Sequence, residues 1–249
     1  MTNRRILRLT GADTRAFLQG LITNDIDKID HGPVYAALLT PQGKFIADFF
    51  VSAQDDAVLI DVAETLGDML VQRLSMYKLR ADVTISPADL HLHRGTGEAP
   101  DNGYVDPRNA AMGWRAFAPT PQAKDHTDWD ALRVEHMIPE TGVELTPDSF
   151  ILEMGFERLN GVDFRKGCYV GQEVTARMKH KTSLRKGLAR VLVEGAVPKG
   201  TELTADGKPA GAVFTQAHDK GLAYLRFDRA TGPMQAGEIA VRRDETAPE

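Results

Sequence analysis

The sequence predicts an α+β protein that ends in a small β-rich domain. The first third of the chain alternates short apolar strands with stretches of helical spacing, and the last quarter consists of short strand-like runs separated by turns. With 42% hydrophobic and 26% charged residues, the composition is that of a globular chain. We therefore expect an α+β region over residues 1–187, in two subdomains of about 1–90 and 91–187, and a small C-terminal β-barrel domain over residues 188–249.

The first subdomain is expected to be a sheet with helices on one face. Apolar residues recur at helical spacing from Phe17 to Ile22, behind a cap at Thr10 or Asp13, and again over Thr65–Leu79. The turn Pro41–Lys44 separates the two strands of a hairpin. The predicted strands are residues 7–9, 35–39, 45–51, 57–60 and 83–85.

The middle of the chain is less regular. Residues 95–102 and 119–128 are small and polar, which is typical of loops, and residues 113–118 between them have the pattern of a strand. A helix over Trp129–His136 should end before Pro139, because the residue before a proline disfavours the helical conformation.

From residue 188 the pattern becomes that of a small β domain. Asp206-Gly207 is a hairpin signal, and glycines mark the other turns. At roughly 60 residues such a domain is marginal by itself, so we expect a small barrel or sandwich that packs against the first domain. The strand-like runs are residues 188–193, 202–204, 212–216, 221–227 and 238–242.

The composition excludes several classes of protein. Cys168 is the one cysteine, so neither an internal disulfide nor a self-contained zinc or iron–sulfur site can form. No run of about 18 apolar residues predicts a membrane helix. The first residues carry Arg4, Arg5 and Arg8 but no apolar core of a secretory signal. We therefore expect a cytoplasmic protein without a membrane partner.

The net charge of −5 hides a basic segment. Between Arg165 and Arg190 the chain has eight basic residues against one acid, Glu173, so this window carries +7 and the remainder −12. Such a window either binds an anion, such as a phosphate, a polyglutamate tail or nucleic acid, or forms a solvated strand-and-loop face. Tyr169 is its one aromatic residue, which argues against a nucleic-acid partner. The basic residues are Arg165, Lys166, Arg177, Lys179, Lys181, Arg185, Lys186 and Arg190.

Cys168 lies in the most informative stretch, residues 164–173. Glycines on both sides allow a tight backbone path, and Lys166 would favour a thiolate, whereas Glu173 would oppose it. The cysteine is therefore either a reactive, substrate-facing thiol or a small buried residue at a turn. A Cys–His pair with His180 or His136 is the weaker interpretation, because nothing fixes a third, orienting group.

Residues 166–173, with the sequence KGCYVGQE, resemble the K-G-C-Y-x-G-Q-E signature of the YgfZ-type folate-binding proteins, relatives of the aminomethyltransferase (T-protein) of the glycine cleavage system. The resemblance covers about residues 6 to 190. Further segments that are similar to family motifs are Leu9–Asp13, Phe17–Gly20, Thr23–Asp25, Tyr35–Lys44, Asp106–Arg108 and Ile138–Glu140.

This resemblance implies a ring of α+β subdomains around a central hole that binds tetrahydrofolate or a derivative. It also implies a role in the assembly or maintenance of iron–sulfur clusters in particular enzymes, with client or assembly proteins as partners. Any catalytic activity would be that of an aminomethyltransferase-like transferase. The signature cysteine is expected to matter for function.

The resemblance also assigns roles to residues. Glu135 lies in an R-x-E segment where T-proteins hold the pterin, whose amine and ring N–H one carboxylate can accept together. Cys168 is the expected reactive residue. Asp48 is expected as a second catalytic residue at the folate edge, or else as a strand residue that faces water. T-proteins have an Asp-Asp pair where this chain has Ala47-Asp48, which weakens the case for glycine-cleavage chemistry. The other predicted folate-binding residues are Lys166, Gly167, Tyr169, Gly171, Gln172, Glu173 and Arg177, with Lys179 and Arg185 as further cations and Tyr35, Tyr77 or Tyr169 as stacking candidates.

Three hypotheses follow. The leading one is a folate-dependent accessory protein for iron–sulfur enzymes. The second is a one-carbon transferase that uses Asp48 and Glu135. The third is a binding module that recognises a protein or RNA through the basic window.

Overall fold

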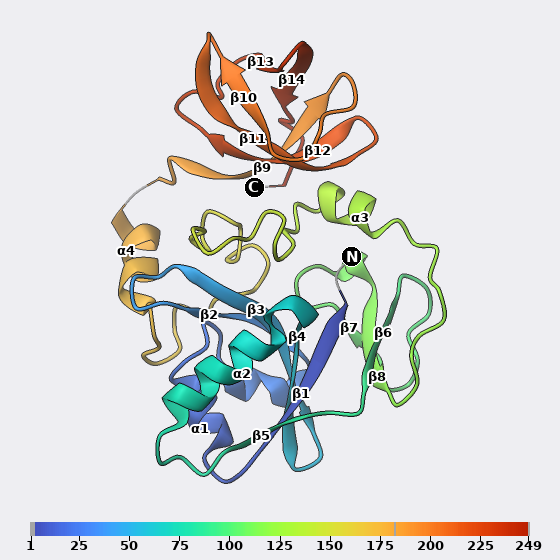
Figure 1. Cartoon of the computed structure of the whole chain (residues 1–249), viewed down its shortest axis with the longest axis vertical. Coiled ribbons are helices and arrows are strands. Elements are labelled where there is room, and N and C mark those ends of the chain that lie inside the picture. Colours follow the sequence, from blue (N-terminus) through green and yellow to red (C-terminus); the bar gives the residue numbers. More distant parts are fainter. Residues whose placement is uncertain (1–2, 182, 249) are drawn as a thin grey trace. The chain divides into compact units, whose positions relative to one another are not determined.

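The computed structural model describes residues 3–181 and 183–248, which form two compact units whose segments alternate along the sequence. The first, here the N-terminal unit, comprises Met1–Thr127 and Leu159–Gln172. The second, here the barrel unit, comprises Asp128–Arg158 and Glu173–Glu249. Figure 1 shows the chain passing from one unit to the other and back.

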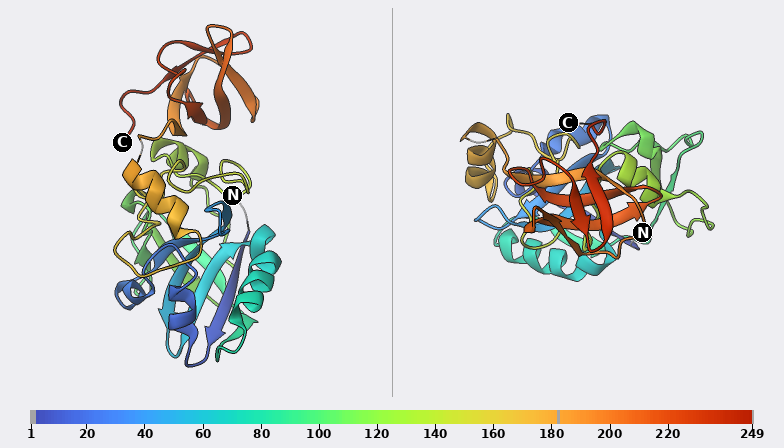
Figure 2. Two further views of the ribbon diagram at one scale, coloured as in Figure 1. Left: turned by 90° about the vertical axis from the view of Figure 1, so that its left-hand side faces the viewer. Right: turned by 90° about the horizontal axis from the view of Figure 1, so that it is seen from above.

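A five-stranded antiparallel sheet with the order β2-β3-β4-β1-β5 is the centre of the N-terminal unit. Helix α2 (Glu64–Lys78) packs on this sheet through Leu70 and Leu74, which are both fully buried. Figure 2 shows α2 along the outside of the sheet. The strands are β1 (Arg4–Thr10), β2 (Val34–Leu39), β3 (Phe45–Gln54), β4 (Ala57–Ala63) and β5 (Thr84–Pro87).

Smaller elements complete this unit. Helix α1 (Thr14–Gln19), the 3-10 helix η1 (Ile26–His31) and the segment between them contribute the apolar residues Leu18, Ile26 and Ile22, respectively, to the core of the sheet. A second antiparallel sheet has the order β6-β8-β7. Its elements are β6 (His91–Gly95), β7 (Tyr104–Val105), η2 (Ala110–Met112) and β8 (Trp114–Ala118).

The barrel unit contains a closed six-stranded barrel with the order β10-β11-β12-β9-β14-β13. Alternate small and branched residues, such as Val191, Val213 and Leu225, fill its interior with less than 1% of their surface exposed. The unit also contains α3 (Trp129–Glu135) and most of α4 (Gln172–Lys181). The barrel strands are β9 (Lys186–Val193), β10 (Thr201–Ala205), β11 (Lys208–Ala217), β12 (Lys220–Arg226), β13 (Met234–Ala236) and β14 (Ile239–Arg243).

The predicted α+β class with a C-terminal β-barrel is confirmed, and the closed barrel excludes the sandwich. The domain boundary at 187 and 188 stays a prediction. One alternative for the basic window was a solvated strand-and-loop face. This was wrong for Gln172–Lys181, because these residues form helix α4. Its apolar side chains, Val174 and Met178, are only half-buried, so it has no apolar stripe to reveal it. Its first turn instead has an ion pair between Glu173 and Arg177, in the favourable i, i+4 order.

Several short elements were also missing from the prediction: η1, η2, β6, β7 and β13. Gly95, expected in a loop, ends β6. Asp13 stands at the start of α1, but its side chain accepts a hydrogen bond from the Asp82 backbone N–H and makes no cap bond to α1. None of the helices in the described ranges is long and apolar enough to cross a membrane.

A buried charge cluster links the two sheets of the N-terminal unit. Asp61 on β4 is fully buried and accepts hydrogen bonds from Arg4 Nε at 2.6 Å and from Arg115 Nη2 on β8. Burial by itself would raise the pKa of the Asp61 carboxyl, but the two guanidinium groups hold that pKa below its ordinary value. The Phe50 ring packs against this cluster, with its centroid 3.7 Å from the guanidinium carbon of Arg115.

Replacing Asp61 should therefore be costly. Asp61→Ala leaves Arg4 and Arg115 without their shared carboxylate, and we expect a loss of about 3–5 kcal/mol in the free energy of unfolding, measured with denaturant. The matched control is Asp56→Ala, which removes an ion pair to Arg8 whose aspartate side chain is 80% exposed. Equal effects of the two substitutions would contradict a structural role for the buried cluster.

Candidate functional site

The segment Lys166–Gly171, here the Cys168 loop, is fixed at its start by a lysine. Lys166 is buried, and its Nζ donates hydrogen bonds to the carbonyl oxygens of Gln19 and Ile22, each at 2.6 Å. These carbonyls lie at and just beyond the end of α1, where a cation is favourable. The ammonium also lies 4.8 Å from the centroid of the Tyr169 ring. Lys166 thus joins two segments that are more than 140 residues apart in sequence.

Burial lowers the pKa of Lys166 to about 8, and the nearby carboxylates of Asp25 and Asp163 act in the opposite direction. The carbonyl oxygens of Gln19 and Ile22 receive its N–H groups. The ammonium is therefore directed at the backbone of the α1 segment.

The other end of the loop is fixed by a glycine. Gly171 has φ +83°, and a Cβ on it would lie 2.6 Å from the carbonyl oxygen of Thr40 and 2.9 Å from the Cβ of Leu39. Both neighbours belong to the end of β2 and the hairpin turn that follows. Only a residue without a side chain allows this close approach in this backbone conformation. The adjacent Val170 N–H donates to the Gly20 carbonyl at 3.3 Å.

Between these two anchors, Gly167 and Cys168 are exposed. The interpretation of Cys168 as a small buried residue is therefore wrong, and the thiol is open to a partner or ligand. Within the described part of the chain, no group of three or more His, Cys, Asp or Glu side chains could hold a metal ion.

The chain before the loop is also tied to the N-terminal segment. Thr23 Oγ1 donates to the Gly161 carbonyl at 2.7 Å, and the Asp163 N–H donates to the Thr23 carbonyl at 3.0 Å. Asn24 Nδ2 donates to the Asn160 carbonyl at 2.6 Å. Hydrogen bonds from the Thr23–Asp25 motif thus hold the segment that leads into the Cys168 loop.

Asp48 lies in β3 and is buried, which excludes the water-facing alternative. It accepts a hydrogen bond of 2.9 Å from the hydroxyl of Tyr35. Burial, and then the charge of Asp48, raises the pKa of Tyr35, so the phenol stays protonated as the donor. The Arg108 guanidinium carbon lies 5.6 Å from the Tyr35 ring centroid and 4.8 Å from that of Phe50.

Sequence reasoning missed the part that Arg108 and Asp106 play here. Nε and Nη2 of Arg108 donate to the two carboxylate oxygens of Asp106 at 3.0 and 2.8 Å. Burial opposes the charge of Arg108, but Asp106 holds its pKa above the ordinary value. In the sequence, Asp106-Pro107-Arg108 stands out only as a family motif, but its two opposite charges on either side of a proline are a signal for this ion pair.

In the barrel unit, Glu135 ends α3 and is half-exposed. Its two carboxylate oxygens accept from Arg190 Nη1 at 2.9 Å and from Lys220 Nζ at 2.6 Å. The Lys220 hydrogen bond contributes most to lowering the pKa of Glu135. Both oxygens are thus engaged, and the predicted pairing with a pterin would require this carboxylate to exchange its partners. That role stays a prediction.

The remaining predicted residues have mixed surroundings. The Gln172 N–H donates to the Tyr169 carbonyl at 3.2 Å and closes a turn into α4. Tyr169 is buried, and Tyr77 is half-buried against the sheet core. Arg177 pairs with Glu173, and Lys179 pairs with Glu157, in each case at exposed positions. Their roles in binding a folate stay predictions, as does a Cys–His pair with His136 or His180, which both belong to the barrel unit.

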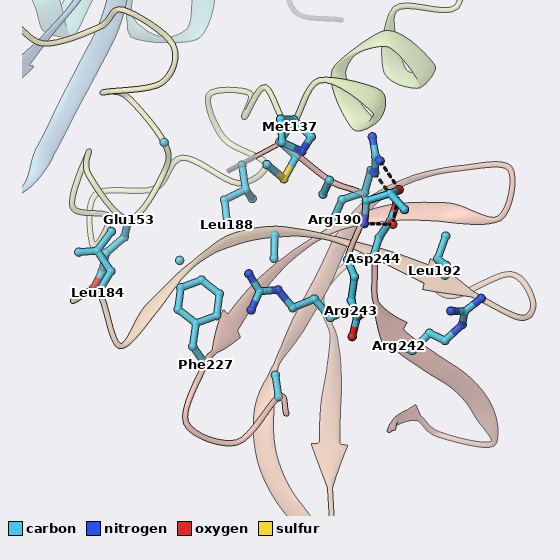
Figure 3. A pocket seen from close by; sticks show the side chains of 18 of the residues that line it. Met137, Glu153, Leu184, Leu188, Arg190, Leu192, Phe227, Arg242, Arg243 and Asp244 are labelled. Carbon is cyan, nitrogen blue, oxygen red and sulfur yellow. Dashed lines mark hydrogen bonds and ion pairs between the residues drawn. The ribbon is translucent and has the colours of Figure 1, made fainter. Parts of the chain in front are cut away.

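A broad pocket of ≈ 1420 Å³ lies within the barrel unit (Figure 3). Met137, Leu188 and Phe227 give it apolar walls, and Arg190 donates to Asp244 at its side at 2.7 Å. Burial opposes the charge of Asp244, but hydrogen bonds from Thr246 and Arg190 outweigh it and lower its pKa to about 2. The same Arg190 holds Glu135, so the predicted pterin residue is joined to the edge of this pocket.

Comparison with solved structures defines the class of the protein. The crystal structure of the glycine cleavage system aminomethyltransferase T from Bartonella henselae matches 98% of this chain and 83% of its own, with a TM-score of 0.75 at 10% identity. The fold is therefore that of the aminomethyltransferase-like α+β proteins with a C-terminal barrel. Residues 185–246 also match the family model of the CAF17 C-terminal β-barrel domain.

Curated relatives then define the family. The chain is 31% identical to the mitochondrial iron–sulfur cluster assembly factor IBA57 of Mus musculus, over 94% of this chain and 78% of the relative. It is 31% identical to the IBA57 homolog of Phaeosphaeria nodorum over 99% and 74%, and 28% identical to human IBA57 over 94% and 78%. The chain belongs to the IBA57/CAF17/YgfZ family of iron–sulfur cluster assembly factors, which confirms the resemblance seen in residues 166–173.

The two ends of the Cys168 loop give a matched pair of substitutions. Gly171→Ala places a Cβ against the Thr40 carbonyl at positive φ, and we expect a loss of about 1–3 kcal/mol in the free energy of unfolding. It should also change the rate at which a maleimide labels Cys168, because the loop must move. Gly167→Ala meets open space within 4 Å and should change neither quantity. If Gly171→Ala behaves like Gly167→Ala, the hairpin does not fix the loop.

Proposed function

We propose that this protein is an accessory factor for the assembly or repair of iron–sulfur clusters in specific enzymes, and that it works with a bound tetrahydrofolate or derivative. The observation that carries the proposal is the exposed thiol of Cys168 on a loop fixed at both ends. Membership of a family named for cluster assembly supports it. The relatives named above are mitochondrial proteins, and a cytoplasmic location for this chain stays a prediction.

A soft thiolate is a good ligand for iron in a cluster. One thiolate holds at most one position, and the described residues offer no second cysteine and no cluster of other ligands. Cys168 would therefore act together with a partner protein, or beside a folate, rather than hold a cluster by itself. An anchored loop suits this task, because a fixed thiol loses little conformational freedom when the partner binds.

The chain offers partial support for a folate ligand. Asp48 supplies a buried carboxylate, and the Tyr35 and Phe50 rings lie beside it in the N-terminal unit, so an acceptor and flat apolar surfaces occur together. Glu135 supplies the second predicted acceptor, although Arg190 and Lys220 engage it. A bound folate would supply one-carbon chemistry or a redox-active ring. The chain's own groups would bind and orient it.

A one-carbon transferase is the second candidate. It rests on the aminomethyltransferase-like fold and on Asp48, the surviving acid of the pair found in T-proteins. The third hypothesis, an RNA- or protein-binding basic surface, has less support, since much of the basic window is engaged within the chain. The engaged cations are Lys166, Arg177, Lys179 and Arg190, whereas the side chain of Lys181 lies outside the described part.

Cys168→Ala tests the thiol. In cells that lack the native protein, we expect this variant to fold and to bind folate normally but to restore the activity of client iron–sulfur enzymes poorly. Cys168→Ser should fail in the same way, because a hydroxyl is a weak ligand for iron. Asp56→Ala, which removes an exposed carboxylate of the N-terminal unit outside the site, is the control and should restore activity. Normal rescue by Cys168→Ala would remove the thiol from the proposal.

A calorimetric titration with tetrahydrofolate tests the ligand. We expect binding in the micromolar range, weakened about 10–100-fold by Glu135→Ala and by Asp48→Asn, since each removes a charged hydrogen-bond acceptor. Glu157→Ala, which removes an exposed carboxylate that pairs with Lys179, should bind like the wild type. Absence of binding to the wild type, together with salt-sensitive RNA binding, would favour the third hypothesis.

Turnover separates the first two hypotheses. A transferase should form methylene-tetrahydrofolate from an aminomethyl donor, and Asp48→Asn should abolish that product. If the protein binds tetrahydrofolate but gives no product with several donors, the accessory role remains and the transferase is rejected.

A further inference from the structure

The C-terminal end of α2 exposes two large apolar side chains. Met76 is 62% exposed, and Leu79, directly after the helix, is 88% exposed. They are two of the four large hydrophobic side chains that stand exposed in the described chain, the others being Tyr104 and Val105 on β7. Leu70 and Leu74 of the same helix are buried in the core against the sheet, and Figure 1 shows α2 lying along that sheet.

Cations border this pair. Arg73 and Arg80 are exposed and Lys78 is half-exposed, and the ion pairs of the described residues include none of the three. Arg73 and Met76 are three residues apart on α2 and therefore lie on the same side of that helix, whereas Arg80 follows Leu79 beyond the end of the helix. The nearest acid that follows, Asp82, accepts a hydrogen bond from the Ala12 N–H. The surface is therefore apolar in its middle and positive at its border.

Leu79 also carries a backbone conformation that does not suit leucine. Its φ is 47° and its ψ is −104°, a region that glycine adopts readily and that costs other residues about 1–3 kcal/mol. Glycine is the residue most often found just after a helix. A leucine at this position strains the backbone and exposes an apolar side chain to water. Neither the backbone conformation nor packing in the core therefore explains why the residue is a leucine.

We propose that Met76 and Leu79, with Arg73, Lys78 and Arg80 around them, bind a protein partner of cluster assembly through an apolar pocket bordered by carboxylates. This inference rests on the proposed function. Charge complementarity selects an acidic border on the partner. Two anchoring side chains in a charged ring are typical of a protein interface, whereas stable membrane attachment needs more apolar area than a methionine and a leucine provide.

Leu79→Gly gives the sharpest test, because folding and docking predict opposite effects. The purified variant should melt at the same temperature as the wild type or higher, since glycine relieves the strain. In cells that lack the native protein, it should restore client iron–sulfur enzyme activity about tenfold less well at equal protein level, since an interface anchor is lost. Leu79→Glu should be worse than Leu79→Lys, because a carboxylate would face the partner's acidic border.

Val105→Glu is the matched control, since Val105 is 61% exposed on β7 and should tolerate the charge. A photo-crosslinking amino acid at Met76 should give an adduct that Leu79→Glu removes and Val105→Glu keeps. If the wild type itself fails to restore the client enzymes, the proposed function is wrong. If the wild type and all three Leu79 variants restore them equally, only the docking surface is wrong. Leu79-dependent sedimentation with phosphatidylserine vesicles would instead assign the surface to a membrane and overturn the protein partner.

Discussion

The ammonium group of Lys166 makes the contact on which the placement of the thiol depends. The chain leaves the N-terminal unit after Thr127, contributes residues 128–158 to the barrel unit, and returns to the N-terminal unit at Leu159. On its return it must be fixed to a surface formed nearly 140 residues earlier. Two hydrogen bonds from one buried amine to the carbonyl groups after α1, together with the bonds of Thr23 and Asn24, achieve this. Without them, the Cys168 loop would be fixed only at its Gly171 end, against the hairpin and Gly20.

Ion pairs of buried charged side chains also join segments elsewhere in the molecule. Asp61 is shared by Arg4 and Arg115, Asp106 holds Arg108 with both oxygens, and Arg190 bridges Asp244 and Glu135. Buried arginines are stable only with such partners, because an unpaired buried charge costs several kcal/mol. Within the basic window, Lys166 and Arg190 are buried in this way, whereas Arg165, Arg177 and Arg185 are exposed. Lys166 and Arg190, which the sequence alone makes candidates for binding an anionic ligand, instead join segments of the chain.

Much of the fold could be predicted from the sequence, and the reasons are local. The β2–β3 hairpin, α2 and the barrel strands have a clear apolar period and turn residues at their ends. Helix α4 could not be predicted, because it begins at Gln172 with polar residues and buries little. The pairing of Lys166 with Gln19 and Ile22 was equally hidden, since no local pattern reveals which carbonyl a distant lysine will reach. The motif around Cys168 located the site, but its exposure and its two anchors are properties of the tertiary structure.

An exposed thiol in a chain with no second cysteine also has a chemical consequence. Oxidation of Cys168 to a sulfenic acid leaves no resolving thiol within the molecule. The way back to the reduced state must come from outside, through glutathione or the thiol of a partner, by way of a mixed disulfide. The redox state of Cys168 is therefore tied to the thiol pool of its compartment, and a partner that covers Cys168 would also shield it from peroxide.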